Sequence, residues 1–433
     1  MKTFVTNKQD KSRVPFLRGI LIRNLGEAGL PFEEAYELAG EVRDELADIS
    51  EISSQELEEL VISLLRRKYS DELIERYSSP VAVPEKIGVI SLGGEISAFS
   101  RGRHQRYLQS SAVMAEDAEK ITLMIYNQLV MAGVHRISTS QLGYLTYLCL
   151  LQEIGKSAAR QYLVWSEFQR SGRPLILLIC GAVGSGKSSI ATEIGHRLEI
   201  VRTQSTDMLR EVMRSMIPRR LMPVLHTSSF DAWETLPIQD LDERSLEHLV
   251  AEGYRSQAEL LALACEAVIQ RAVRETTPLI LEGVHAQPDL VNTVSEKSGA
   301  IVVHVTLAVM RAEELKNRLT GRGLHEPRRK ANRYLKKFPS IWALQTYVLG
   351  EAERCDTPII PNDDKEAAIN QLVHTVNREL ARSFDGSPAD VFGKVVNGAK
   401  KAASQRTWQE MVTRLVPSED IGPQSVTKAA SSR

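Results

Sequence analysis

A glycine-rich segment near the middle of the chain constrains the fold more than any other feature. Residues 181–188 read GAVGSGKS and fit the pattern G-x-x-x-x-G-K-[ST]. The apolar run 174–180 before it is typical of a central strand covered on both faces, and a helical pattern follows it. A coincidental glycine-rich turn is the alternative, but the flanking strand and helix argue against it. The sequence therefore predicts a phosphate-binding loop in a parallel α/β domain.

The loop pattern implies a particular chemistry. Glycines let backbone N–H groups curl around phosphates at a helix N-terminus, whose partial positive charge favours an anion. We expect Lys187 to neutralise the transferred phosphate, and the Ser188 hydroxyl to bind Mg²⁺ carried with ATP. The residues expected to bind this nucleotide are Gly181, Gly184, Gly186, Lys187, Ser188 and Ser189.

Four more β-prone runs follow the loop, and they begin at Ile200, Pro278, Ala300 and Thr357. Helical segments separate them, so every crossover can be right-handed. Together with 174–180 they predict an α/β fold with a five-stranded parallel sheet, the core size of a small P-loop kinase. Ligands bind beyond the carboxyl ends of such strands, so the residues after each run are candidates for chemistry.

Polar residues follow two of these runs. Asp207 lies at a strand-to-helix join and is expected to orient or deprotonate an acceptor hydroxyl, although helix N-capping is a second possible role. Arg210 and Arg214 share roughly one helical face with it and are expected to bind substrate. Glu282 and His285 follow the next run and are also expected to bind substrate, and Glu282 could hold a magnesium-bound water.

A third polar group lies at 226–234, which reads HTSSFDAWE. It could line a pocket for the acceptor, but ordinary turn and cap chemistry explains the same composition. The candidate substrate-binding residues within it are His226, Ser228, Ser229 and Asp231.

A basic segment follows the fourth predicted strand. Residues 318–337 contain eight lysines and arginines against one acid, Glu326. We expect a mobile lid that closes over the phosphates, excludes water and stabilises the transferring charge, with Arg318 and Arg322 as catalytic residues. Contact with nucleic acid is the alternative, although no RNA-binding signature accompanies the segment.

The first 170 residues contain an internal repeat. The segment from Pro15 matches the segment from Ala98 at an offset of 83, and serines with N-cap character, Ser53 and Ser138, recur at an offset of 85. Two small, mainly α-helical domains of similar fold are therefore expected. The predicted boundaries are 1–80 and 85–170 for these domains, 173–383 for the kinase domain, and 384–433 for a poorly ordered tail.

Each repeat opens with a β-prone stretch followed by Arg-Gly, in FLRG and FSRG. This pattern resembles the ATP-cone, a small regulatory nucleotide-binding domain at the N-terminus of ribonucleotide reductases and some other proteins. The resemblance implies that Arg18, Gly19 and Arg23 contact a regulatory nucleotide, whereas solvated helix arginines are the alternative. The second copy lacks the lysines and arginine of the first copy's opening hairpin, so we expect it to be a degenerate partner.

Longer segments between 173 and 380 resemble 2-phosphoglycerate kinases, a family best described in methanogenic archaea. The matching segments read STDMLREVMR, LHTSSFDAW, LILEGVH, RYLKKFPSIWALQTYV and TPIIPNDD. The resemblance implies ATP-dependent phosphorylation of 2-phosphoglycerate to 2,3-bisphosphoglycerate, an acceptor whose carboxylate and phosphate suit the surplus of arginines. It also implies that Asn362 lies near the adenine.

Other functions stay open at this point. They are a kinase of another small phosphorylated hydroxy acid, a nucleotide-sensing regulator with little or no phosphate transfer, and a polynucleotide 5′-hydroxyl kinase. The 54 Lys and Arg against 55 Asp and Glu give no general polyanion-binding field, so nucleic acid is not an expected partner. Four distant cysteines and no apolar run near the roughly 20 residues of a membrane span favour a reduced, cytoplasmic protein. A homo-oligomer could form through the N-terminal domains.

Overall fold

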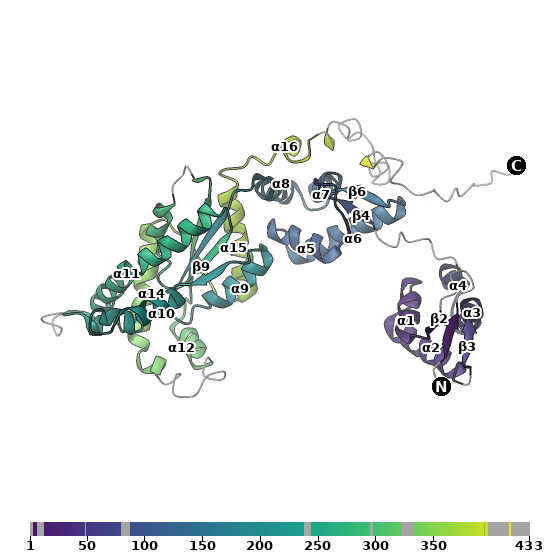
Figure 1. Cartoon of the computed structure of the whole chain (residues 1–433), viewed down its shortest axis with the longest axis horizontal. Coiled ribbons are helices and arrows are strands. Elements are labelled where there is room, and N and C mark those ends of the chain that lie inside the picture. The colour runs from purple at the N-terminus through teal and green to yellow at the C-terminus, as the bar shows by residue number, and fades with distance from the viewer. Residues whose placement is uncertain are drawn as a thin grey trace. The chain divides into compact units, whose positions relative to one another are not determined.

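The structure is a computed structural model that describes residues 3–6, 13–47, 49–78, 87–237, 244–294, 298–321, 333–393, 395–396 and 415–416. The described residues before Gly88 form one compact unit, and those from Gly88 onward form a second unit (Figure 1). Among the described residues, no helix combines the length and apolar character that a membrane crossing requires.

The first unit contains the first repeat. Its strands pair in the order β2-β1-β3, in which β1 is antiparallel to β2 and parallel to β3. Leu25, Leu38, Val61 and Leu65 are fully buried between its helices, so the repeat has a core of its own. The elements are β1 (Phe4–Thr6), β2 (Arg13–Pro15), α1 (Arg18–Glu27), α2 (Phe32–Glu45), β3 (Glu51–Ser53), α3 (Ser54–Lys68) and α4 (Asp71–Ser78).

The second repeat opens the second unit and has the same order of elements. Its sheet has the order β5-β4-β6, again with one antiparallel and one parallel pair. Ser53 and Ser138 each form a capping box, with Glu56 and Gln141 respectively, so both predicted N-caps are confirmed. The elements are β4 (Gly88–Ile90), β5 (Ile96–Ala98), α5 (Arg101–Ser110), α6 (Ala115–Met131), β6 (Arg136–Ser138), α7 (Thr139–Glu153) and α8 (Lys156–Ser171).

The remaining sheet has five parallel strands in the order β11-β10-β7-β9-β8, which confirms the predicted fold class. The run from Ile200 enters the sheet only at Thr203. Glu199 adopts a left-handed conformation (φ 56°) and the Ile200 N–H returns to the Gly195 carbonyl, so Ile200 still belongs to the end of the preceding helix. The strands are β7 (Leu175–Cys180), β8 (Thr203–Ser205), β9 (Leu279–Glu282), β10 (Ile301–Ala308) and β11 (Ile359–Pro361).

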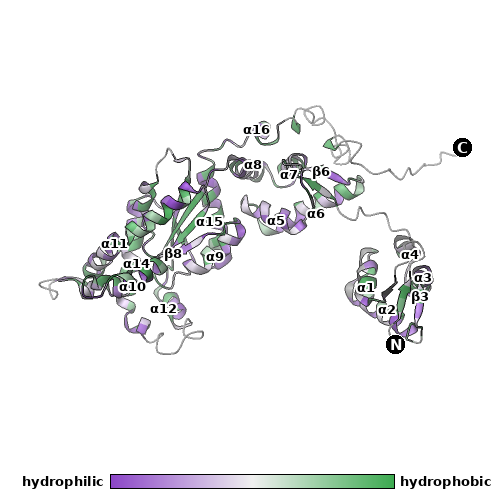
Figure 2. Cartoon of the chain, viewed as in Figure 1, coloured by the Kyte–Doolittle hydropathy of each residue, from purple (hydrophilic) through white to green (hydrophobic). Residues whose placement is uncertain are grey.

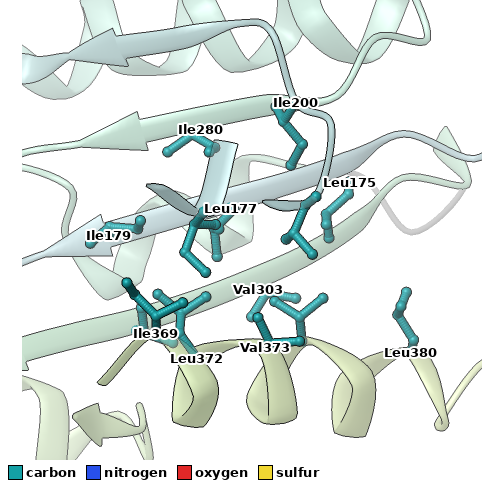
Figure 3. Packing of buried hydrophobic residues seen from close by; sticks show 14 of the residues in the cluster. Leu175, Leu177, Ile179, Ile200, Ile280, Val303, Ile369, Leu372, Val373 and Leu380 are labelled. Atoms are coloured by element: carbon teal, nitrogen blue, oxygen red, sulfur yellow. The ribbon is translucent and has the colours of Figure 1, made fainter. Parts of the chain in front are cut away.

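Helices cover both faces of this sheet. On one face, Leu177 and Val303 contact a cluster that includes Ile369 and Leu372 of α15 (Figure 3). On the other face, Leu178 of β7 joins a cluster with α11. Full burial of one such side chain stabilises the fold by roughly 1.5–3 kcal/mol. In Figure 2 most of the central strands are coloured hydrophobic, whereas the helices around them carry both hydrophobic and hydrophilic residues. The helices are α9 (Lys187–Arg197), α10 (Thr206–Met216), α11 (Leu246–Arg274), α12 (Ala312–Gly321), α14 (Phe338–Arg354) and α15 (Lys365–Leu380), with short 3-10 turns at Pro223–His226 (η1), Ala232–Thr235 (η2) and Pro288–Thr293 (η4).

The segment after α15 differs from the expected poorly ordered tail. Phe384, Val391 and Phe392 are buried, and the Gly386 N–H donates to Glu167 Oε2 at 2.9 Å. The short helix α16 (Pro388–Phe392) packs on α7 and α8. The polar composition of 384–433 as a whole concealed these few apolar residues. Residues 397–414 and 417–433 lie outside the described part of the chain.

Candidate active site

The glycine-rich loop connects β7 to α9 in the predicted way. Gly184 and Gly186 have φ values of 88° and 85°, a left-handed region that suits glycine. Helix α9 begins at Lys187, and no side chain of the described residues caps it. Its first N–H groups are therefore available to an anion held by the loop.

Lys187 is the most informative side chain of the loop. It is only 6% exposed, and among the described residues no carboxylate forms an ion pair with it. A lysine held in a mostly buried position is stabilised when an anion joins its ammonium group. The structure therefore prepares a cationic position at the point where a phosphate would lie.

Ser188 and Glu282 meet at the ends of α9 and β9. The Ser188 hydroxyl donates to Glu282 Oε1 at 3.0 Å. Glu282 is 5% exposed, and its second oxygen, Oε2, has no hydrogen-bond partner among the described residues. These oxygens fit Mg²⁺, which prefers oxygen ligands and usually keeps waters and substrate phosphates in its shell. Within the described part of the chain, no group of three or more His, Cys, Asp or Glu side chains forms a separate metal site.

Asn362 braces the loop from the end of β11. Its side-chain Nδ2 donates to the Ser185 carbonyl at 2.7 Å, and it is 4% exposed. Arg318 of α12 donates to the Asn362 carbonyl and also to Glu314 Oε1, at 2.9 Å. Asn362 therefore shapes the phosphate loop, and its contact with adenine stays a prediction. Arg318 lies next to the loop, whereas Arg322 lies outside the described residues.

Asp207 lies in the first turn of α10. The N-cap of this helix is Ser205, whose Oγ accepts from the Asp207 N–H at 3.2 Å, so the N-cap role considered for Asp207 is wrong. The Asp207 side chain is 52% exposed and forms an ion pair of 3.4 Å with Arg210. A partly exposed carboxylate beside a guanidinium is available to an acceptor.

His285 is the centre of a buried polar network behind Asp207. Its Nε2 lies 2.9 Å from Gln257 Oε1 and 3.3 Å from Ser229 Oγ, and its Nδ1 lies 3.4 Å from Thr206 Oγ1. The Gln257 amide nitrogen donates to the Val224 carbonyl, so its Oε1 accepts from His285 Nε2–H. Burial lowers the pKa of His285 to about 3, so the ring is neutral near pH 7.

Asp231 joins the predicted acceptor stretch to the predicted lid. Its side chain is 7% exposed and forms ion pairs with Arg333 (3.5 Å) and Lys337 (3.3 Å). Lys337 also hydrogen-bonds to Glu234, which raises the pKa of Lys337. Arg333 donates to Ser228 Oγ at 3.3 Å. Two basic residues from the end of the lid segment thus meet the HTSSFDAWE stretch.

Other predicted residues have structural partners. His226 Nε2 hydrogen-bonds to the Ile217 carbonyl at 2.8 Å, which is turn chemistry, and Arg214 forms an exposed ion pair with Glu211. In the first repeat, the Arg18 guanidinium donates to the Tyr36 carbonyl at 2.7 Å and lies 3.7 Å from the Tyr36 ring centroid. Gly19 is exposed, and the Arg23 side chain lies outside the described residues.

Sequence reasoning missed three contributors to the site. Ser205 caps α10, Thr206 contacts His285, and Gln257 connects His285 to the backbone of 224–227. Ser205 and Thr206 precede an obvious helical pattern, so cap chemistry could have indicated them. Gln257 lies inside the 29-residue helix α11, where no local signal separates it from a solvent-facing glutamine.

Comparisons with known proteins agree with this geometry. The chain is 31% identical over 306 residues to the 2-phosphoglycerate kinase of Pyrococcus horikoshii, a match that covers 70% of this chain and 98% of that protein. It is 32% identical over 317 residues to the 2-phosphoglycerate kinase of Methanopyrus kandleri (73% and 94%), and 32% identical over 291 residues to that of Pyrococcus furiosus (67% and 93%).

Two other comparisons add less. A solved gluconokinase from Sinorhizobium meliloti superposes with a TM-score of 0.26 and 15% identity over 49% of this chain and 93% of that chain, a score too low to carry an argument. No family model matches the chain, and the resemblance of the repeats to ATP-cones stays a prediction. The identity and coverage of the relatives are decisive: this chain is a phosphotransferase with an alcohol group as acceptor, and it belongs to the 2-phosphoglycerate kinase family.

Proposed function

We propose that this protein transfers the γ-phosphate of ATP to the free hydroxyl of 2-phosphoglycerate and produces 2,3-bisphosphoglycerate and ADP. The bond between the γ-phosphorus and its bridging oxygen breaks, a bond to the acceptor oxygen forms, and the hydroxyl proton leaves. The observation that carries the proposal is the buried Lys187, which has no ion pair among the described residues and adjoins the Ser188–Glu282 pair, in a family of 2-phosphoglycerate kinases.

The residues of the loop have distinct roles in this proposal. Lys187 binds the oxygens of the transferred phosphate, and the loop N–H groups hold the rest of the triphosphate. Ser188 and Glu282 would hold Mg²⁺, directly or through water, and the ion would supply positive charge to the phosphates. Arg318 lies next to the loop through its bond to Asn362, so its guanidinium can offset the charge that develops during transfer.

The acceptor residues lie at the start of α10 and on the HTSSFDAWE stretch. Asp207 orients the acceptor hydroxyl and accepts its proton as the new bond forms. The acceptor carries a carboxylate and a phosphate, to which Arg210, Arg333 and Lys337 would donate charge-assisted hydrogen bonds in addition to their present ion pairs. His285, neutral and fully hydrogen-bonded, positions Ser229 and Thr206 and takes no part in proton transfer.

The experiment is transfer from [γ-³²P]ATP and Mg²⁺ to 2-phosphoglycerate, 3-phosphoglycerate, glycerate or no acceptor, with the labelled products resolved. We expect label in bisphosphoglycerate with the 2-isomer alone. Lys187→Ala removes the loop cation, and Lys120→Ala, an exposed lysine of α6, is the matched control. Label in a different acid alone would mean that this acid, and not 2-phosphoglycerate, is the acceptor. Equal labelling by the Lys187→Ala variant would refute the assignment of the phosphate loop as the active site.

A regulatory role for the first repeat is a separate proposal that rests on sequence. Its opening hairpin contains Lys8, Lys11 and Arg13, which would suit nucleotide phosphates. Equilibrium dialysis of the Lys187→Ala variant with ATP tests it, because the remaining bound ATP would then report sites other than the phosphate loop. Loss of all ATP binding in that variant would contradict the proposal.

A further inference from the structure

A cavity of about 350 Å³ lies in the second repeat. Its walls come from the β4–β5 hairpin, from α5, α7 and α8, and from Phe392 of α16. Much of the lining is apolar or aromatic: Leu92, Phe99, Tyr107, Leu142, Tyr162 and Phe392. None of the lining residues belongs to the phosphate loop. A concave, mostly apolar space of this size with a few polar groups is typical of a small-molecule site.

Phe392 is a fixed part of this cavity. The residue is 4% exposed, its ring packs edge-on against Tyr144 at a centroid distance of 5.7 Å, and the Arg170 guanidinium lies 5.7 Å from its centroid. A side chain at position 143 would exclude it, since a Cβ added to Gly143 would lie 2.6 Å from the Phe392 ring. The absence of a side chain at 143 therefore allows an aromatic wall.

The charges around the cavity are few. Arg103 and Arg170 line it, and neither guanidinium forms an ion pair with a carboxylate of the described residues. His104 also lines it, but Thr122 and Thr146 occupy its two ring nitrogens at 2.8 and 3.0 Å. Burial lowers the pKa of His104 to about 4, so this ring adds no charge near pH 7.

The hairpin over the cavity does not add cations. Residues 88–98 contain no lysine or arginine, and they include Glu95. A polyphosphate would bring several negative charges to two exposed arginines and an acid, which is a poor match. A single anionic group is a better match, because two guanidiniums can hydrogen-bond it while its apolar body lies against the aromatic rings.

We propose that this cavity binds a small amphipathic monoanion, with a flat aromatic or branched apolar body against Phe99, Tyr162 and Phe392 and one carboxylate-like or sulfonate-like group at Arg103 and Arg170. The proposal is independent of the acceptor assigned to the phosphate loop. Because Phe392 follows α15 in the chain, a bound molecule would contact a segment that continues directly from the kinase domain.

The test uses the full chain with two fluorescent probes. One is 8-anilinonaphthalene-1-sulfonate, a flat monoanion, and the other is its uncharged analogue N-phenyl-1-naphthylamine. Titrations contain saturating Mg²⁺ and ATP, so the phosphate loop is filled. We expect the wild-type chain to bind both probes, with the sulfonate bound more tightly.

Two matched double variants separate charge from apolar contact. Arg103→Gln with Arg170→Gln should weaken binding of the sulfonate probe by roughly tenfold or more, because both guanidiniums lose their charge-assisted hydrogen bonds to the anion, and should leave binding of the neutral probe within about twofold. Arg106→Gln with Arg160→Gln changes exposed arginines of the same two helices that do not line the cavity, and should alter neither probe. Leu142→Trp fills the cavity and should weaken the binding of both probes. Circular dichroism verifies that this variant folds.

Three results would overturn the proposal. The first is sulfonate binding that the two double variants weaken equally. The second is binding that a folded Leu142→Trp chain retains in full. The third is displacement of the sulfonate by ATP in the Lys187→Ala variant, which would make the cavity a nucleotide site instead. The exposed arginine substitutions leave the core intact, so their outcome does not depend on whether Leu142→Trp folds.

Discussion

The phosphate loop and the cavity of the second repeat place their charges in opposite ways. At the loop, Lys187 and Glu282 are 6% and 5% exposed, and Glu282 Oε2 has no hydrogen-bond partner among the described residues. At the cavity, Arg103 and Arg170 are exposed and the interior is lined by rings and leucines. The phosphate loop therefore suits a highly charged ligand, whereas the cavity offers apolar surface with two arginines at its edge.

This difference has a physical consequence for each ligand. A charge in a mostly buried position is poorly solvated while the site is empty. Its attraction to a bound phosphate is therefore stronger than the attraction of the same two charges in water. An exposed arginine is already solvated, so its contribution to binding is smaller and serves mainly to orient the ligand. Substitutions at the loop should therefore have the larger effects.

The largest effect is expected for Lys187→Ala. Loss of a cation that stabilises the transferring phosphate should reduce kcat by about a hundredfold or more. Thermal stability should change little, because Lys187 forms no ion pair with the described residues. Phosphate transfer and thermal unfolding are the measurements, and Lys120→Ala is the control. Probe binding at the second-repeat cavity should be unchanged, and a parallel loss there would show that the two sites are not separate.

Asp207→Asn comes next. The variant keeps the size of the side chain but cannot accept a proton, so kcat should fall by roughly a hundredfold or more with a small change in KM for the acceptor. Because Ser205 caps α10, the free energy of unfolding should barely change. Ser205→Ala is the matched comparison, and it should lose about 1 kcal/mol of stability while kcat changes little. An Asp207→Asn chain that loses stability and keeps kcat would assign Asp207 a structural role.

Sequence patterns predicted the parallel sheet and the loop because both depend on local signals. A continuous apolar run, three glycines and a Lys-Ser pair are adjacent in the chain, and β7, Gly184 and Gly186 lie as expected. The Ser53 and Ser138 caps were predictable for the same reason, since a capping box spans only four residues.

The rest depended on long-range packing. The pairing of Asp231 with Arg333 and Lys337 joins residues about a hundred positions apart, and no periodicity indicates it. The bond from Asn362 to Ser185 and the seat of Phe392 beside Gly143 likewise join distant segments. N-capping was the alternative role considered for Asp207, but Ser205 lies two residues earlier and caps the helix.

Acid should destabilise both regions through buried histidines. His304 lies in β10 and hydrogen-bonds to the Ala286 carbonyl. Burial lowers the pKa of His104 and of His304 to about 4 and that of His285 to about 3, whereas the unfolded value is about 6.5. As the pH falls below 6.5, the unfolded chain binds protons that the folded chain does not, so folding stability is lost between pH 6.5 and 4. Each histidine should contribute roughly 2 kcal/mol of this loss at pH 5.

Single substitutions separate the contributions of the histidines. His104→Gln and His285→Gln keep a hydrogen-bonding side chain but cannot be protonated, so each should flatten the decline in urea-derived stability between pH 7 and 5. His196→Gln, on α9, is the control, because His196 is not among the buried histidines. An equally steep decline in all three variants would mean that carboxylates control the acid limb.

The most local effect is expected at the boundary between the second repeat and α16. In Gly143→Ala the new methyl group would lie 2.6 Å from the Phe392 ring, and the strain should cost roughly 1–3 kcal/mol in urea unfolding. Phe392→Leu removes the ring atoms in the way, so the double variant should be less destabilised than the sum of the two single variants. This difference between the double variant and the sum of the single variants measures the contact between position 143 and Phe392, apart from any general loss of packing. Additive costs would show that Phe392 does not lie against Gly143 in solution, and the aromatic wall of the cavity would then be lost.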